Sequence, residues 1–201
     1  MIVAVTDRKA CEGSFLQQIE RICDIGIDML ILREKDMEPE DYQRLAISCK
    51  DICKAHNVLF CVNSFIGVSK EIKADLVQIP MGALKEGIPC GMGYGVSVHT
   101  IDEVYAVNGS NASFVIFGNV FETDSKPGLI GKGLDMLGEV CNASKVPVLA
   151  IGGIDSKNCR SVMGTGASGI CARGLFMRGD LSEAIDLIGS IKSELKGFKP
   201  I

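Results

Sequence analysis

Short runs of β-branched residues alternate with helical patterns along the whole chain, and this alternation limits the possible folds more than any other feature. It is typical of a parallel sheet built from βα units. We expect eight strands, at Ile2–Thr6, Met29–Arg33, Leu59–Asn63, Ala74–Gln78, Gly93–Val98, Phe114–Phe117, Val148–Ile151 and Gly169–Cys171. The clearest helical patterns are Ser14–Asp24, Pro39–Ala55, Thr100–Val107, Gly133–Cys141, Ser156–Met163 and Leu181–Leu195. Eight strands in 201 residues predict one α/β domain over residues 1–201, a (β/α)8 TIM barrel near the small end for that fold.

Local signals refine this prediction at three places. Thr100 and Asp155-Ser156 precede helical patterns and suit helix N-terminal caps. Residues 81–93 are rich in glycine and lack helical periodicity. We therefore expect the helix after the fourth strand to be short or missing.

Composition argues against several classes of partner. The chain is 47% hydrophobic and 23% charged, with a net charge of −4 and no run rich in Lys or Arg. We therefore expect no nucleic-acid partner. No apolar stretch approaches the roughly 20 residues that cross a bilayer, so we expect no membrane partner. The first residues read as a strand and not as a signal peptide, which favours a cytoplasmic location. A homodimer is compatible with a barrel of this size.

The nine cysteines are scattered, odd in number and without a CxxC pair. Four of them, Cys23, Cys61, Cys141 and Cys171, have apolar neighbours in the sequence. We interpret the cysteines as small buried hydrophobic residues in a reducing compartment and predict no cysteine metal site.

In a TIM barrel the active site is built at the carboxyl ends of the strands, so chemistry is sought there. On the second strand Ile31, Arg33 and Lys35 share one face, because side chains alternate along a strand. Two cations at this end would attract phosphate or carboxylate. The alternative is a solvated pair balanced by Glu34 and Asp36.

The fifth strand carries the best candidate for proton transfer. If Val96 and Val98 pack outward, Ser97 and His99 point toward the barrel axis. A lone histidine is more often structural. The second histidine, His56, falls between a helix and a strand at the opposite end of the barrel, which leaves His99 as the catalytic candidate.

Two further loops suit a phosphate ester. The loop after the sixth strand combines hydroxyls and a lysine, at Thr123, Ser125 and Lys126, as expected of a lid over a polar ligand or of an ordinary surface loop. Gly152-Gly153 follow the seventh strand and Arg173-Gly174 follow the eighth. Turns at these two strand ends form the phosphate site of many TIM barrels.

These motifs resemble the thiamin phosphate synthase superfamily, and within it the thiazole tautomerase branch. The resemblance spans nearly the whole chain and is most specific at residues 95–104, 115–137 and 146–154, with LVQIP at residues 76–80 nearer the tautomerases. It implies a role in vitamin B1 synthesis. The synthase joins a pyrimidine pyrophosphate to a thiazole phosphate with magnesium, whereas the tautomerase aromatises a carboxylated thiazole phosphate by proton transfer.

The two branches differ at positions that this sequence lets us compare. Ile31 stands where the synthase pattern has Gln, and Ser64 and Ala83 stand where it has magnesium-binding acids. Losing both carboxylates removes the charge that would hold Mg²⁺. Ser125-Lys126, in contrast, agrees with the synthase pair that grips pyrophosphate.

Our leading hypothesis is therefore a cofactor-free tautomerase, an isomerase that binds a thiazole phosphate. His99 would transfer the proton, Gly152, Gly153, Arg173 and Gly174 would hold the phosphate, and the other substrate contacts would come from Arg33, Lys35, Asn63, Ser97, Thr123, Ser125 and Lys126. The first alternative is a divergent synthase, a transferase that recruits another acid, such as Asp36 or Asp124, for Mg²⁺. The second is a non-catalytic barrel that binds or regulates through a phosphate-ester pocket.

Overall fold

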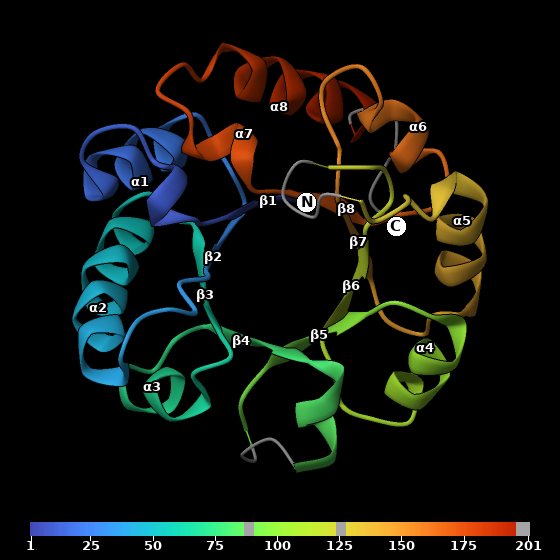
Figure 1. Ribbon diagram of the computed structural model, residues 1–201, viewed down its shortest axis with the longest axis horizontal. Helices are drawn as coiled ribbons and strands as arrows, with labels where there is room; N and C mark the ends of the chain where they lie inside the picture. Colours follow the sequence, from blue (N-terminus) through green and yellow to red (C-terminus); the bar gives the residue numbers. More distant parts are fainter. Residues whose placement is uncertain (87–90, 124–127, 196–201) are drawn as a thin grey trace.

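Eight parallel strands pair in sequence order, and β1 pairs with β8 to close a barrel that helices surround in the computed structural model (Figure 1). The structure describes residues 1–86, 91–123 and 128–195. The strands are β1 (Ile2–Val5), β2 (Met29–Leu32), β3 (Leu59–Asn63), β4 (Leu76–Pro80), β5 (Tyr94–Val98), β6 (Phe114–Gly118), β7 (Val148–Ile151) and β8 (Gly169–Ala172). The predicted (β/α)8 barrel is confirmed, with strand ends that differ by one or two residues.

The helices lie outside the strands (Figure 1). They are α1 (Phe15–Asp24), α2 (Pro39–Ala55), α3 (Ile66–Glu71), α4 (Ile101–Asn108), α5 (Gly133–Ala143), α6 (Cys159–Met163), α7 (Gly174–Met177) and α8 (Ser182–Leu195). Two 3-10 helices, η1 (Arg8–Ala10) and η2 (Met81–Glu86), follow β1 and β4. Among the described residues between β4 and β5 the helical segment is the short η2, in agreement with the expectation of a short or missing helix.

Alternation along the strands divides the buried residues into two layers. Inward-facing residues form a small core within the barrel, made of Val3, Val5, Met29, Ile31, Cys61, Phe114, Ile116, Leu149 and Cys171. Residues at the intervening positions belong to a larger core between strands and helices. Val96 and Val98 belong to this outer core, as predicted, which turns Ser97 and His99 inward.

Glycine makes room inside the barrel at Gly95. A Cβ atom there would lie 2.2 Å from the ring of Phe114 on the neighbouring strand β6. Contacts under 3.0 Å require a shift, so the missing side chain allows the larger ring to fill the interior.

Of the two predicted helix caps, the one at Thr100 is present, whereas Asp155 caps a turn ahead of α6 and not the helix itself. Thr100 Oγ1 accepts a hydrogen bond from the Glu103 N–H at 3.2 Å. Asp155 Oδ1 accepts from the N–H groups of Lys157 and Asn158 at 2.8 and 3.0 Å. These bonds accompany a turn over residues 156–158, and α6 begins at Cys159 instead of the predicted Ser156.

The cysteines of the described residues are free thiols, most of them buried. Within the same residues no group of three His, Cys, Asp or Glu side chains is arranged to hold a metal ion. No helix in the described part of the chain has the length and apolar character that crossing a membrane requires.

Candidate active site

A cavity of about 720 Å³ opens at the carboxyl ends of the strands. Most residues predicted for the site line it, namely Arg33, Lys35, Ser97, His99, Thr123, Gly152, Gly153, Arg173 and Gly174. Asn63 is not among the lining residues, and Ser125 and Lys126 lie outside the described residues. The structure thus brings together side chains from β2, β5 and the loops after β6, β7 and β8, while their roles stay predictions.

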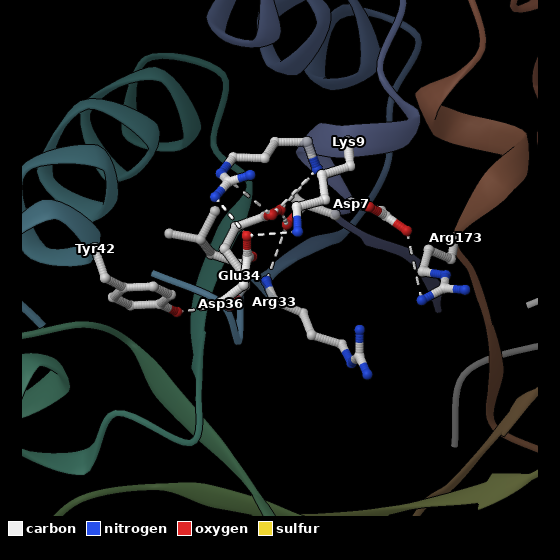
Figure 2. Close-up of polar contacts among 10 residues, drawn as sticks. Asp7, Lys9, Arg33, Glu34, Asp36, Tyr42 and Arg173 are labelled. Atoms are coloured by element: carbon white, nitrogen blue, oxygen red, sulfur yellow. Dashed lines mark hydrogen bonds and ion pairs between the residues drawn. The ribbon is translucent and has the colours of Figure 1, made fainter. Parts of the chain in front are cut away.

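The backbone around Arg33 is held by a buried hydrogen-bond chain. The Arg33 N–H donates to Thr6 Oγ1 at 2.9 Å, and the Thr6 hydroxyl donates to Glu34 Oε1 at 2.6 Å. Glu34 is only 3% exposed and also accepts from the Arg8 N–H. Glu34 is therefore turned toward Thr6 and Arg8, while Arg33 extends into the cavity (Figure 2).

The guanidinium of Arg33 has no hydrogen-bond or ion-pair partner among the described residues. Burial lowers its pKa first, and the nearby charge of Arg173 lowers it further. A half-buried cation beside another cation is stabilised when an anion enters. The geometry favours an anion site here over the alternative of a pair balanced by Glu34 and Asp36.

Asp36 does not neutralise Arg33, because other cations already hold it. Its carboxylate lies 2.7 Å from Arg8 Nη2 and 2.9 Å from Lys9 Nζ. Asp36 is also absent from the cavity lining. It is therefore a poor candidate for the replacement magnesium ligand that a divergent synthase would need, and the other candidate, Asp124, lies outside the described residues.

The turn after β7 strongly favours glycine at two successive positions. Gly152 has φ +108° and Gly153 has φ +64°, conformations that L side chains rarely adopt. A Cβ atom on Gly153 would lie 2.4 Å from the Glu122 carbonyl oxygen, and one on Gly152 would lie 2.6 Å from Asn119 Cβ. The absence of side chains lets this turn pack closely against residues 119–122, and both glycines line the cavity. Their backbone N–H groups are the kind of group that can bind a phosphate.

His99 faces the cavity with its tautomer set by the backbone. Its Nδ1 lies 2.8 Å from the Gly118 carbonyl oxygen, which can only accept a hydrogen bond. Nδ1 therefore carries a proton, and in the neutral ring Nε2 is the acceptor. His56 lies at the end of α2, with Nδ1 3.1 Å from Asp24, as its place between a helix and a strand predicted.

Gln78 is a cavity residue that the sequence analysis did not single out. Its Nε2 donates to the Ile79 carbonyl at 3.0 Å and to Ser97 Oγ at 2.5 Å, while its Oε1 accepts from Asn63 Nδ2. Because Ser97 accepts this bond, its own proton remains available to a ligand. The signal was present in LVQIP, where Gln78 falls between the fully buried Val77 and Ile79.

Tyr42 of α2 joins the ends of β2 and β3, next to Arg33 and Asn63. Its hydroxyl donates to the Leu32 carbonyl at 2.6 Å and accepts from the Asn63 N–H at 3.2 Å. Leu32 and Val62 are the last paired residues of β2 and β3, so the hydroxyl bridges the two strands where direct pairing stops. It thereby helps to position Arg33 and Asn63.

The fold and the site define a (β/α)8-barrel protein with a cationic cavity and a glycine turn at the carboxyl ends of its strands. The family described as thiamine monophosphate synthase matches residues 2–175. A thiamine-phosphate synthase of Coprothermobacter proteolyticus is 35% identical over 84% of this chain and 83% of that protein. One of Fusobacterium nucleatum is 29% identical over 93% of this chain and 94% of that protein.

Solved structures agree on the fold. A thiamine phosphate pyrophosphorylase from Pyrococcus furiosus superposes with a TM-score of 0.85 over 96% of each chain, at 24% sequence identity. A 3-hexulose-6-phosphate synthase superposes with a TM-score of 0.66 at 18% identity. The chain belongs to the thiamine monophosphate synthase family and is an enzyme of thiamine biosynthesis. The names of its relatives favour the synthase over the tautomerase that our sequence analysis placed first.

Proposed function

We propose that this chain is a thiamine-phosphate synthase, a transferase that joins a pyrimidine pyrophosphate to a thiazole phosphate. The observation that carries the proposal is 35% identity, over most of both chains, to a protein of that name. The half-buried Arg33, which has no partner among the described residues, supports it because a pyrophosphate would supply the missing negative charge. Membership in an enzyme family argues against the non-catalytic barrel.

The proposed reaction has one bond broken and one formed. The carbon–oxygen bond between the pyrimidine's exocyclic carbon and pyrophosphate breaks, and pyrophosphate leaves with the electron pair. The thiazole ring nitrogen then bonds to that carbon. Gly152, Gly153 and Gly174 would hold the thiazole phosphate, while Arg33 and Lys35 would face the leaving group. Cations at that position stabilise the negative charge that develops as the bond breaks.

The residues of this chain do not fit the family's magnesium site. Ser64 and Ala83 occupy the positions at which the synthase pattern has acids. The Ser64 hydroxyl donates to Asn63 Oδ1 at 3.3 Å, and no described cluster of three potential ligands replaces the lost carboxylates. We therefore assign the neutralisation of pyrophosphate to the protein's own cations and derive no step through a metal ion.

The synthase proposal is tested by mixing the two substrates with the purified protein and measuring thiamine phosphate and pyrophosphate, with Mg²⁺ and with EDTA. We expect product in both conditions. Arg33→Gln should lower kcat/KM by about 10²-fold, the scale expected when one charge-stabilising donor is lost. The matched control is Arg44→Gln, which changes an arginine that is 74% exposed on α2.

Two results would contradict this proposal. Absence of product under all conditions excludes the synthase, and a strict requirement for Mg²⁺ excludes charge neutralisation by protein cations alone.

A second candidate, the thiazole tautomerase, is favoured by His99 and by the missing acids. With Nδ1 bonded to the Gly118 carbonyl, Nε2 is free to accept a proton from substrate. The test incubates the dearomatised thiazole carboxylate phosphate with wild type and His99→Ala. A tautomerase accelerates aromatisation in a manner that depends on His99, and a spontaneous rate with both proteins rejects this candidate.

The cytoplasmic location and a homodimer remain predictions.

A further inference from the structure

Asp7 lies beside the two arginines of the cavity and has no role in the proposed reaction. It follows β1, while Arg33 follows β2 and Arg173 follows β8, so the three residues come from neighbouring strands. Figure 2 shows the Asp7 carboxylate directed toward Arg173, with the Arg33 side chain extending into the same region. The charge of Asp7 acts on Arg33 as well, where it opposes the lowering of the arginine's pKa.

The contact between Asp7 and Arg173 is loose. Arg173 Nη1 lies 3.5 Å from Asp7 Oδ2, and no other hydrogen bond or ion pair of the Arg173 side chain is found among the described residues. Charge-assisted N–H···O bonds are normally about 2.7–2.9 Å long. The nearby acids are held more tightly, since Asp36 lies 2.7 Å from Arg8 and Glu34 lies 2.6 Å from the Thr6 hydroxyl. Asp7 therefore neutralises Arg173 without holding it firmly.

We propose that Asp7 is a competitor of anions for Arg173. In the ligand-free protein the Asp7 carboxylate pairs with Arg173, and a phosphate or pyrophosphate oxygen replaces it when an anion binds. Arg173 lines the cavity, whereas Asp7 does not. An entering anion can thus reach the guanidinium from the cavity side. The exchange replaces one weak ion pair by a closer one, and the anion also meets the guanidinium of Arg33, which has no partner in the described part of the chain.

This proposal predicts the sign of a binding change. If Asp7 only oriented Arg173, its removal would weaken anion binding. If Asp7 competes, Asp7→Asn should tighten binding by about tenfold, because one opposing charge is removed at close range. The side chains of Asp7 and Arg173 are 27% and 24% exposed, so an amide of the same size is tolerated without burying a new polar group.

The test titrates pyrophosphate, and in a second arm inorganic phosphate, into the full chain by calorimetry at constant ionic strength. We expect Asp7→Asn to tighten binding of at least one of these anions by about tenfold. Asp36→Asn is the matched control, since it removes the same charge from an acid that pairs with Arg8 and Lys9 and not with an arginine of the cavity. That control should change affinity by less than about twofold, as is usual for a surface charge.

A double-mutant cycle distinguishes competition for Arg173 from a general electrostatic effect of the Asp7 charge on anion binding. In an Arg173→Gln background the gain from Asp7→Asn should shrink by at least about threefold. Unchanged or weaker binding in Asp7→Asn overturns the proposal, as does an equal gain in both backgrounds. Asp7→Ser, which also removes the charge, repeats the measurement should the first variant lose its thermal transition.

The inference rests on the phosphate-ester site of the proposed function, but the titration involves no turnover. A protein that binds pyrophosphate more tightly as Asp7→Asn and makes no thiamine phosphate would refute the synthase and leave the competitor in place. A protein that makes thiamine phosphate and shows no gain in affinity as Asp7→Asn would support the synthase and refute the role of Asp7 as a competitor.

Discussion

Replacing Tyr42 by phenylalanine tests whether the Tyr42 hydroxyl holds together the ends of β2 and β3, next to Arg33 and Asn63. Tyr42 is fully buried, and its hydroxyl joins the Leu32 carbonyl to the Asn63 N–H at 2.6 and 3.2 Å. Burial raises the pKa of this phenol well above its usual range, so the hydroxyl is protonated at neutral pH and can donate. Tyr42→Phe removes one oxygen and keeps the ring stacked on Phe65.

The expected cost follows from the two backbone groups left behind. An unsatisfied buried donor or acceptor costs about 1–3 kcal/mol, and partial closure of the gap between β2 and β3 recovers some of it. We therefore expect a loss of about 2–3 kcal/mol in the free energy of unfolding, with the N–H and carbonyl each contributing about half. For a chain of this size that loss corresponds to a fall in Tm of about 5–10 °C.

The assay is thermal and urea unfolding followed by circular dichroism, with Tyr105→Phe as the control. Tyr105 is 60% exposed on α4, so the same loss of an oxygen should change the unfolding free energy by less than about 0.5 kcal/mol. Pyrophosphate affinity should also fall in Tyr42→Phe, because Arg33 follows Leu32 directly. A Tm within 2 °C (roughly 0.5–1 kcal/mol) of the Tyr105→Phe value would refute the bridging role.

Three further predictions concern the turn after β7, a buried acid and a buried thiol. Gly153→Ala should weaken phosphate binding at least about tenfold in calorimetric titrations, because its Cβ meets the Glu122 carbonyl. Gly138→Ala, which has open space on α5, should instead raise stability by about 0.5–1 kcal/mol. Burial raises the pKa of Glu34, so the folded state holds its proton more tightly than the unfolded state. The stability of wild type relative to Glu34→Gln should therefore fall as pH rises above the ordinary glutamate pKa, and a constant difference across urea titrations at several pH values would contradict this. Burial raises the pKa of Cys171 to about 12, so an aromatic disulfide reagent should label it only after unfolding, as peptide mapping would detect.

Much of the fold could be predicted from the sequence because each βα unit carries its own signal. Short runs of β-branched residues between helical patterns placed the ends of the eight strands within two residues. Side chains alternate between the two faces of a strand, so a register change would turn every inward side chain outward. The same alternation correctly turned Arg33, Ser97 and His99 toward the cavity. Two short helices were not predicted, because the six-residue α3 and the four-residue α7 are too brief to show a helical period.

The site was predicted less completely, since several of its contacts join residues far apart in the chain. Gln78 and Tyr42 matter through bonds to Ser97, Leu32 and Asn63, and nothing in local sequence reports those bonds. Asn63, predicted to line the pocket, instead donates to Gln78 from outside the lining. We chose between the synthase and the tautomerase from the absence of two acidic residues. The names of the relatives favour the synthase, which we had ranked second.

The amino-acid sequence alone predicted the eight-strand barrel and the end of the barrel that carries the cavity, and most of the residues that it singled out for the site line that cavity. Periodicity and strand ends suffice for these, because backbone geometry alone dictates which way each side chain of a strand points. Which charges lie close together, in contrast, depends on the folded chain. Asp36 is held by Arg8 and Lys9, Asp7 lies against Arg173, and the Arg33 guanidinium is left without a partner among the described residues. Closing the barrel brings the ends of β1, β2 and β8 together, and electrostatic energy depends on that distance in space and not on separation along the chain.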